Sequence, residues 1–321
     1  MKRPEDWDRA VEVLAAAPAV SIACHVNPDG DALGSLLAAS LGLRQLGKET
    51  YPSWGTRPVA VPPSYAFLPG SDSVLQVADV PSGGAFLALD CGAVGRLGDL
   101  QPVASKAENV INVDHHPGND DFGHLNLVVT EASSTAELVM RLLLDLGVNV
   151  DLDIATCLYT GIVTDTGSFQ YANASPDTLR LAADLLGLGV SAPAIAQEVF
   201  ESAPFGFLKL AGRVLDRAEL CDEGLVWSWV GRKDLAETGV HPDESDQLID
   251  MIRSTRDADI AALFKEQRDG GWKVSLRSKG PRTVGHLARA RGGGKHDLAA
   301  DFTVAEIEPT VADLRRDLGA K

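Results

Sequence analysis

Several features are scarce in this chain, and each scarcity excludes a class of protein. Its cysteines, at positions 24, 91, 157 and 221, lie far apart without a CxxC pair, which argues against a disulfide framework or a zinc finger. No segment approaches the roughly 20 apolar residues of a membrane span. The N-terminal stretch lacks the apolar core of a signal peptide. The chain has no low-complexity tract, so long disordered segments are not expected. We therefore expect a soluble cytoplasmic protein that does not associate with membranes.

Charge is abundant but unevenly spread. The 321 residues carry a formal net charge of −16, which disfavours binding to long polyanions. From Trp272 to His296, however, there are seven Lys or Arg residues and no Asp or Glu. Such a local basic face suits a small anionic ligand better than long duplex nucleic acid, which needs many phosphate contacts. An ordinary solvated surface is the alternative interpretation.

The pattern along the chain predicts an α/β first domain and an α+β second domain. In the first, the apolar runs "AVSIACH", "AFLALD", "NVINVDHH" and "LNLVVT" read as strands, separated and followed by helical patterns, which favours a parallel sheet. Later, two hairpins are expected, turning at residues 222–224 and 269–271. We predict a catalytic domain over residues 1–190, a helical linker over 191–215 and a smaller domain over 216–321.

Acidic and imidazole side chains follow the apolar runs of the first domain. Taken singly, these residues have ordinary explanations: a helix N-cap, a turn residue or a buried core histidine. The carboxyl ends of parallel strands, however, meet at one crevice, so the runs direct their polar ends to one place. The set comprises His25, Asp29 and Asp31 after the first run, Asp90 after "AFLALD", Asp114, His115 and His116 at "NVINVDHH", and Asp165 in "TDTGSF".

Such a set predicts divalent cations. Carboxylates brought close together are costly unless cations neutralise them. Oxygen and imidazole donors suit manganese, magnesium or zinc. Five or six donors are too many for one catalytic ion with open positions, so we expect two ions bridged by Asp90, an arrangement suited to phosphoryl displacement. Gly30 is expected to allow a sharp turn that directs Asp29 and Asp31 inward.

These segments together resemble the DHH phosphoesterase superfamily, named for the triplet found here at residues 114–116. The motifs "NPDGDALGS", "LDCG", "VDHH" and "TDTGSF" occur in the family's order, and "ASSTAEL" also looks like a family segment. The C-terminal "SLRSKG" and "GGGKHDLAA" look like the associated nucleotide-binding domain. The similarity is greatest to the nanoRNase/pAp-phosphatase branch. The fold it implies is an α/β parallel-sheet DHH domain followed by a smaller α+β DHH-associated domain.

The resemblance also implies residue roles. One ion would be held by His25, Asp29 and Asp90, and the other by Asp31, Asp90, His115 and Asp165, with Mn²⁺ the usual ion and Mg²⁺ or Co²⁺ as substitutes. His116 would donate to the scissile phosphate, and Asp114 would orient a ligand histidine. The substrate's terminal phosphate and base would be held by Arg277, Ser278, Lys279, Gly292, Gly293, Gly294 and His296. Glycine-loop N–H groups would suit the phosphate oxygens.

This chain departs from the family pattern at the glycine loop, where Lys295 and Asp301 replace glycines, and at Gln170, where related chains often carry Arg. The expected activity is hydrolysis of short oligoribonucleotides, dinucleotides (cyclic, or linear products of these) and 3′-phosphoadenosine 5′-phosphate (pAp). The alternatives are a family-II pyrophosphatase or exopolyphosphatase, and a catalytically silent nucleotide-binding protein. The sequence leaves open whether the protein is a homodimer, since helices such as "ELVMRLLLDLG" suit a core or a dimer surface.

Overall fold

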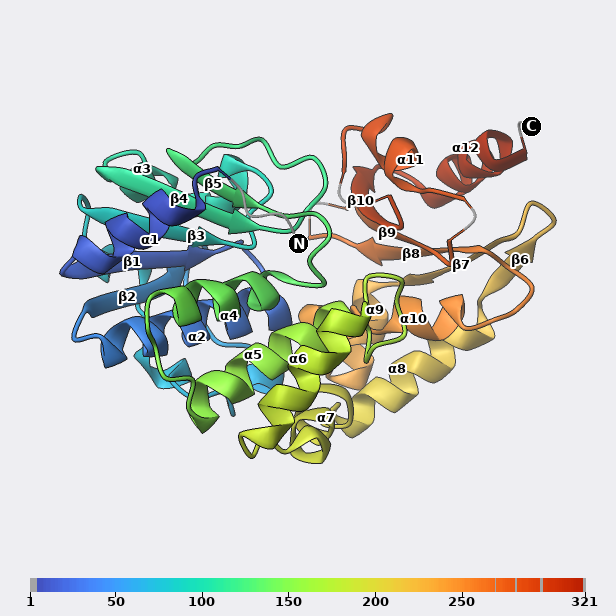
Figure 1. Cartoon of the computed structure of the whole chain (residues 1–321). Helices are drawn as coiled ribbons and strands as arrows, with labels where there is room; N and C mark the ends of the chain where they lie inside the picture. Colours follow the sequence, from blue (N-terminus) through green and yellow to red (C-terminus); the bar gives the residue numbers. More distant parts are fainter. Residues whose placement is uncertain (1–4, 269, 281, 295–296, 320–321) are drawn as a thin grey trace. The chain divides into compact units, whose positions relative to one another are not determined.

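The chain folds into two compact units, described here from a computed structural model (Figure 1). The structure describes residues 5–268, 270–280, 282–294 and 297–319. The first unit is Met1–Ser202 and the second is Ala203–Lys321. Their boundary falls inside the stretch 191–215 for which we predict a helical linker.

The first unit is built on a parallel five-stranded sheet, as the sequence predicts. Its strand order is β2-β1-β3-β4-β5. All four strands expected from the apolar runs are present. The edge strand β2 was not expected, because its sequence ETYPSW is polar and contains a proline, which sheets accept mainly at their edges. The strands are β1 (Ala19–Cys24), β2 (Glu49–Trp54), β3 (Ala85–Leu89), β4 (Asn109–Asp114) and β5 (Leu125–Val128).

The strand order locates a crevice. Chain connections run in opposite directions from β1, to β2 on one side and to β3 on the other. In open parallel sheets, ligands bind beyond the carboxyl ends of the strands at such a reversal. The segments that follow β1 and β3 therefore occupy the position best suited to a site.

Helices surround this sheet. α2 is buried along nearly its whole length, because it packs on β1 and β2 and also against α4 and α5. Gly34 of α2 permits this approach, since a Cβ there would lie 2.4 Å from the carbonyl oxygen of Cys157 on α5. The helices are α1 (Trp7–Ala16), α2 (Gly30–Gln45), α3 (Gln101–Ala104), α4 (Thr135–Asp145), α5 (Leu152–Asp165), α6 (Pro176–Gly187) and α7 (Ala192–Phe200).

The second unit has a mixed sheet with the order β10-β9-β8-β7-β6, in which only β7 and β8 run parallel. Both predicted hairpins, β6–β7 and β8–β9, are confirmed. Alternate residues of β7 and β8 enter two different apolar clusters, so helices cover both faces of the sheet. The strands are β6 (Glu219–Cys221), β7 (Leu225–Val230), β8 (Ile260–Glu266), β9 (Trp272–Ser278) and β10 (Ala299–Val304).

The helices of this unit contribute to separate clusters. Residues of α8 and α10 belong to one apolar cluster, and residues of α11 and α12 to the other. Their bounds, with that of α9, are α8 (Phe205–Asp216), α9 (Arg232–Thr238), α10 (Leu248–Arg253), α11 (Gly285–Arg289) and α12 (Ile307–Gly319). Among the described residues, no single helix has the length and apolar character to cross a membrane, although α6 and α7, bent by 109°, meet that test together.

Candidate metal centre

The turn between β1 and α2 supplies three polar side chains. Asp29 is the N-cap of α2, and its Oδ1 accepts a hydrogen bond of 3.1 Å from the Ala32 N–H. Its other oxygen, Oδ2, faces His25 Nε2 at 3.7 Å. One oxygen of this carboxylate therefore caps the helix, and the other is left to face His25.

The reason expected for Gly30 is wrong. Gly30 is the first residue of α2 and does not have a positive φ. A Cβ at this position would lie 2.4 Å from Oγ1 of Thr164 on α5. Glycine is needed here because α2 and α5 approach closely, and this approach brings Asp31 on α2 near Asp165 at the end of α5.

Asp90, directly after β3, has an unusual backbone conformation. Its φ is 58°, in the left-handed region that few residues other than glycine adopt, although aspartate tolerates it better than most. The Asp90 N–H donates to the Val113 carbonyl of β4 at 3.0 Å, which ties this turn to the sheet. Backbone strain of this kind concentrates at functional positions.

The first cluster of donor atoms joins the ends of β1 and β3. His25 Nε2 lies 3.4 Å from Asp90 Oδ2 and 3.7 Å from Asp29 Oδ2. Nδ1 of the same ring is 2.9 Å from the Val26 carbonyl oxygen. A backbone carbonyl on one ring nitrogen is the usual way to aim the other nitrogen at a metal.

The second cluster lies on the other side of Asp90. His115 Nε2 is 3.6 Å from Asp165 Oδ2 and 3.8 Å from Asp90 Oδ1. It is also 3.9 Å from Asp31 Oδ2. Its Nδ1 faces the Ala132 carbonyl at 3.3 Å. Asp90 thus turns Oδ2 toward the first cluster and Oδ1 toward the second.

The N-terminus of α4 holds two of these carboxylates. The N–H groups of Thr135 and Ala136 donate to the two oxygens of Asp31, at 2.6 and 2.8 Å. The Thr135 hydroxyl donates to Asp90 Oδ1 at 2.8 Å. Carboxylates are favoured at a helix N-terminus, where backbone N–H groups lack partners within the helix. The sequence marks "ASSTAEL" as a family segment but does not reveal these contacts.

Asp165 is held by a residue that the sequence analysis missed. Asn173 Nδ2 donates to the Asp165 carbonyl at 3.2 Å, to its Oδ2 at 3.3 Å and to the Ser133 carbonyl at 2.8 Å. Between them the chain turns through Gly167, Ser168 and Phe169, all with positive φ. This left-handed turn returns Asn173 to the carboxylate.

Asp114, fully buried at the end of β4, contacts His116. Its Oδ1 lies 2.7 Å from His116 Nδ1. The sequence predicts that Asp114 orients a ligand histidine, and the hydrogen bond found goes to His116 rather than to His115. His116 Nδ1 is also 3.5 Å from Asp90 Oδ1, the oxygen that faces the second cluster.

The pKa values of the clustered side chains reflect the crowding of acidic groups. Burial lowers the pKa of His25, but hydrogen bonds to Asp29 and Asp90 raise it to about 10. Burial likewise opposes protonation of His115, but Asp165 and Asp90 raise its pKa to about 9. Burial raises the pKa of Asp165 to about 7. For Asp90, burial is outweighed by the hydrogen bond from His25, and the pKa is lowered. In the absence of a cation, protons on the imidazoles thus compensate the carboxylates.

The donors fit divalent cations. Three sets of three atoms lie within 4.8 Å of one another among the described residues. They combine carboxylate oxygen with imidazole nitrogen, the chemistry expected for manganese, magnesium or zinc. The sets are His25, Asp29 and Asp90; Asp31, His115 and Asp165; and Asp90, His115 and His116.

The substrate-binding residues predicted from the sequence lie in the second unit. Arg277 and Ser278 end β9, and Lys279 follows them. The Ser278 hydroxyl donates to the Arg282 carbonyl, and Lys279 Nζ donates to the Thr255 carbonyl. Arg277 Nη1 donates to the Leu276 carbonyl at 3.0 Å. His296, and Lys295 beside it, lie outside the described residues.

The glycine loop does not have the expected N–H arrangement. The N–H groups of Gly292, Gly293 and Gly294 donate to main-chain carbonyls at 3.1, 2.9 and 3.2 Å. A Cβ on Gly293 would lie 2.1 Å from the Asp301 carbonyl oxygen. Glycine is therefore required at 293 for packing against β10, and the idea that these N–H groups cradle a phosphate is not supported by this conformation.

Asp301, which replaces a glycine of the family pattern, contacts basic side chains of β9. Its carboxylate lies 3.6 Å from Lys273 Nζ and 3.9 Å from Arg277 Nη1. Asp301 faces Ser275 in the antiparallel register of β10 and β9, so both cations are diagonal neighbours on one face. A built-in carboxylate thus competes for the arginine expected to bind phosphate.

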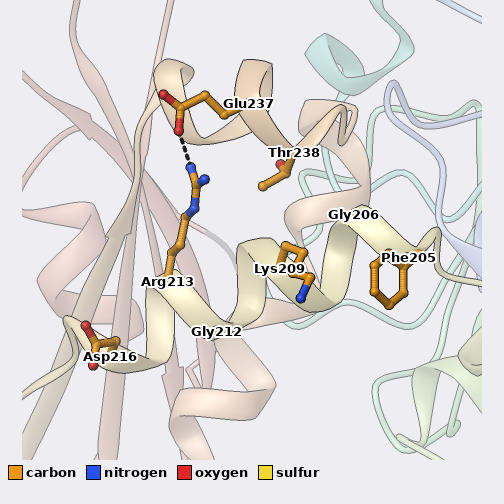
Figure 2. A pocket seen from close by; sticks show the side chains of 8 residues that line it. All are labelled: Phe205, Gly206, Lys209, Gly212, Arg213, Asp216, Glu237 and Thr238. Carbon is orange, nitrogen blue, oxygen red and sulfur yellow. Dashed lines mark hydrogen bonds and ion pairs between the residues drawn. The ribbon is translucent and has the colours of Figure 1, made fainter.

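A pocket of about 710 Å³ also lies in the second unit, between α8 and the end of α9 (Figure 2). Its Arg213 is held by Glu237, with Nη1 2.7 Å from Oε2, and Lys209 lies over the Phe205 ring at 5.3 Å. Arg213 and Glu237 thus pair with each other, and none of the predicted site residues lines the pocket. We assign it no catalytic role.

Comparison with known proteins agrees with this architecture. The model of the DHH family, N-terminal domain, matches residues 19–162, and that of the DHHA1 domain matches residues 224–317. The chain is 36% identical to the bifunctional oligoribonuclease and PAP phosphatase NrnA of Thermus thermophilus, over 95% of this chain and 91% of the relative.

Two solved structures extend the comparison. An exopolyphosphatase-related protein from Bacteroides fragilis is 25% identical with a TM-score of 0.89, covering 98% of this chain and 96% of that one. RecJ from Thermus thermophilus, crystallised with Mn²⁺, is 16% identical with a TM-score of 0.61 over 99% of this chain and 55% of RecJ, a likeness of fold alone. From the paired domains and the NrnA relative, the chain belongs to the DHH family, in its nanoRNase/pAp-phosphatase branch.

Proposed function

We propose that this protein is a metal-dependent phosphoesterase that hydrolyses short oligoribonucleotides and dinucleotides, including cyclic dinucleotides or their linear products, and pAp to mononucleotides. The observation that carries the proposal is the orientation of Asp90. Its two oxygens face two separate sets of ligand side chains, 3.4 Å from His25 on one side and 3.8 Å from His115 on the other. The similarity to an oligoribonuclease and PAP phosphatase supports the substrate class.

The residues divide into two metal-binding sets. His25, Asp29 and Asp90 would hold one divalent ion, and Asp31, Asp90, His115 and Asp165 the other. Mn²⁺ is the ion we propose, because hard carboxylates and borderline imidazoles both suit it. When bound, such ions polarise the phosphoryl oxygens and make a water molecule nucleophilic at neutral pH.

His116 and Asp114 would act on the ester itself. Asp114 Oδ1 accepts from His116 Nδ1–H, and in the doubly protonated ring the Nε2–H would donate to the scissile phosphate. Burial lowers the pKa of His116, but the hydrogen bond to Asp114 raises it above the usual value, which favours the donor form. Asp114 thus fixes the ring orientation that this role needs.

The second unit would select the substrate. We propose that Arg277, Ser278, Lys279 and His296 contact its terminal phosphate and base, and that Gly292, Gly293 and Gly294 shape the loop beside them. Arginine suits this task because its planar guanidinium can bind two phosphate oxygens. The four cysteines are free thiols, three of them buried, which suits the cytoplasmic location that we propose.

A substrate panel tests the proposal. The full chain is incubated with Mn²⁺ and a series of 5′-phosphorylated RNAs of increasing length, cyclic and linear dinucleotides, pAp and pyrophosphate, and the products are identified. We expect mononucleotides from the short RNAs, AMP and phosphate from pAp, and no turnover after chelation. Preferential cleavage of pyrophosphate would instead identify a pyrophosphatase, and binding without any turnover would identify a silent nucleotide-binding protein.

A further inference from the structure

Asn119 lies in the loop after β4, three residues beyond His116, and contacts the buried carboxylate of Asp114. Its Nδ2 donates to Asp114 Oδ2 at 2.5 Å and to the Cys91 carbonyl at 3.2 Å. Asp114 thus has its two oxygens engaged by different side chains, Oδ1 with His116 and Oδ2 with Asn119. Neither the family motifs nor the sequence analysis gives Asn119 a role.

The orientation of the Asn119 amide is determined by its neighbours. Its Oδ1 accepts the Asp121 N–H at 2.8 Å, and Nδ2 of Asn112 at 3.1 Å. A backbone N–H can only donate, and an ionised carboxylate can only accept. Turning the amide by 180° would set its oxygen against the Asp114 carboxylate and its NH₂ against the Asp121 N–H. The amide therefore presents its NH₂ to Asp114 and no other arrangement satisfies both sides.

This arrangement affects His116 because Asp114 has no exposure to solvent. Water cannot replace a donor that is lost from a fully buried carboxylate without rearrangement, so loss of Asn119 would leave Oδ2 poorly satisfied. The carboxylate would then rotate toward other donors, and the His116 ring, 2.7 Å from Oδ1, would move with it. That ring also lies 3.5 Å from Asp90 Oδ1, so little freedom exists for it to move without disturbing the site.

We propose that Asn119 is a positioning residue that acts through Asp114 to fix the ring orientation of His116. This inference rests on the proposed function, in which His116 donates to the substrate, and deepens it. Asn119 would touch neither substrate nor metal. Its effect on turnover would therefore depend entirely on His116.

The experiment uses the full chain with Asn119→Ala and a matched control, Asn126→Ala. Asn126 supports the same loop, accepting from the Gly123 N–H and donating to the carbonyls of Asp121 and Gly123, but no contact joins it to Asp114. We expect Asn119→Ala to lower kcat for a short RNA by about tenfold to a hundredfold, with KM and Mn²⁺ affinity nearly unchanged. The control should keep its kcat.

A double-mutant cycle separates positioning from a general structural effect. In a His116→Ala background, Asn119→Ala should cause no further loss of kcat, because the residue it positions is already absent. Asn119→Asp, which keeps the shape of the side chain but removes the NH₂ donor, should repeat the effect of Asn119→Ala. Additive losses in the double variant, or equal losses in Asn119→Ala and the loop control, would overturn the inference.

A spectroscopic readout keeps the inference independent of turnover. The ¹H and ¹⁵N shifts of the His116 Nδ1–H should report its hydrogen bond to Asp114 in the wild type and a weaker hydrogen bond in Asn119→Ala. A wild type without turnover of any phosphoester would reject the proposed function, while the ring shifts would still decide the positioning claim. Unchanged shifts in Asn119→Ala would reject that claim even in an active enzyme.

Discussion

Thr135 donates a hydrogen bond from Oγ1 to Asp90 Oδ1, with 2.8 Å between the two atoms. The donor stands on the first turn of α4 and the acceptor follows β3, so the bond joins two elements 45 residues apart. Its N–H also binds Asp31, so Thr135 links two carboxylates of the second proposed metal-binding set. The first prediction concerns this link.

Thr135→Val should lower Mn²⁺ affinity by about tenfold to a hundredfold, because it removes a hydroxyl that orients a metal-binding carboxylate while keeping the side-chain shape. Calorimetric titration with Mn²⁺ measures this. Thr135→Ser should restore most of the affinity. Thr160→Val is the matched control, since Thr160 is also buried but its hydroxyl only donates to the Thr156 carbonyl on α5. Equal losses in both variants would show a packing effect instead.

Asp90→Asn should abolish turnover almost wholly, by about 10³-fold or more, as expected when two sites share one ligand. Steady-state kinetics with a short RNA and Mn²⁺ measures it. Asp99→Asn serves as the control, because Asp99 in the same unit is half-exposed and pairs with Arg57. Substantial turnover by Asp90→Asn would contradict the bridging role.

Mn²⁺ binding should strengthen as pH rises. Without metal, the pKa of His25 is about 10 and that of His115 about 9, so both rings are doubly protonated and positively charged at neutral pH. A cation must displace these protons, and each unit of rising pH weakens that competition until the pKa is passed. Titration calorimetry between about pH 6.5 and 8.5, in buffers of different ionisation enthalpy, should show rising affinity and proton release. A pH-independent affinity without proton release would contradict it.

Asp301→Asn should lower KM for pAp by about twofold to fivefold, the size of one weak ion pair, because it frees Arg277 from a competing carboxylate 3.9 Å away. Arg277→Ala should instead raise KM with little change in kcat, if the contact between Arg277 and the phosphate is equally strong in the ground state and the transition state. Asp313→Asn, on α12, is the control for a change in surface charge. An unchanged KM in both Asp301→Asn and Arg277→Ala would argue against a phosphate site here.

Gly34→Ala should destabilise the first unit by about 1–3 kcal/mol, because the new Cβ would meet the Cys157 carbonyl at 2.4 Å. Mn²⁺ affinity should fall as well, since α2 carries Asp31 and α5 ends at Asp165. Gly187→Ala on α6 meets no atom within 4 Å and should leave stability nearly unchanged. Denaturant unfolding followed by circular dichroism compares the two. A Gly34→Ala protein as stable as the wild type would show that the helices can separate at no cost.

Much of the first unit could be predicted from its sequence. The strands that lead into "CH", "LD" and "VDHH" have nearly continuous apolar sequences, because a parallel sheet is buried on both faces. The sequence could not indicate β2, whose proline and polar residues are tolerated only because the strand lies at the edge. It also misled about Gly30, where glycine serves the close packing of two helices rather than a turn, and it did not indicate that Gly293 packs against β10.

By itself the sequence determined which donor atoms are present and that they follow the strands of a parallel sheet, because side-chain chemistry and apolar periodicity are local properties. Only the tertiary structure decided how the donors are aimed. The left-handed backbone of Asp90, the α4 N–H groups on Asp31, and the amide of Asn119 on Asp114 depend on close contacts between segments distant in the chain or on the course of a single loop. Hydrogen bonds act over about 3 Å, so their partners are set by the folded backbone and not by spacing along the sequence.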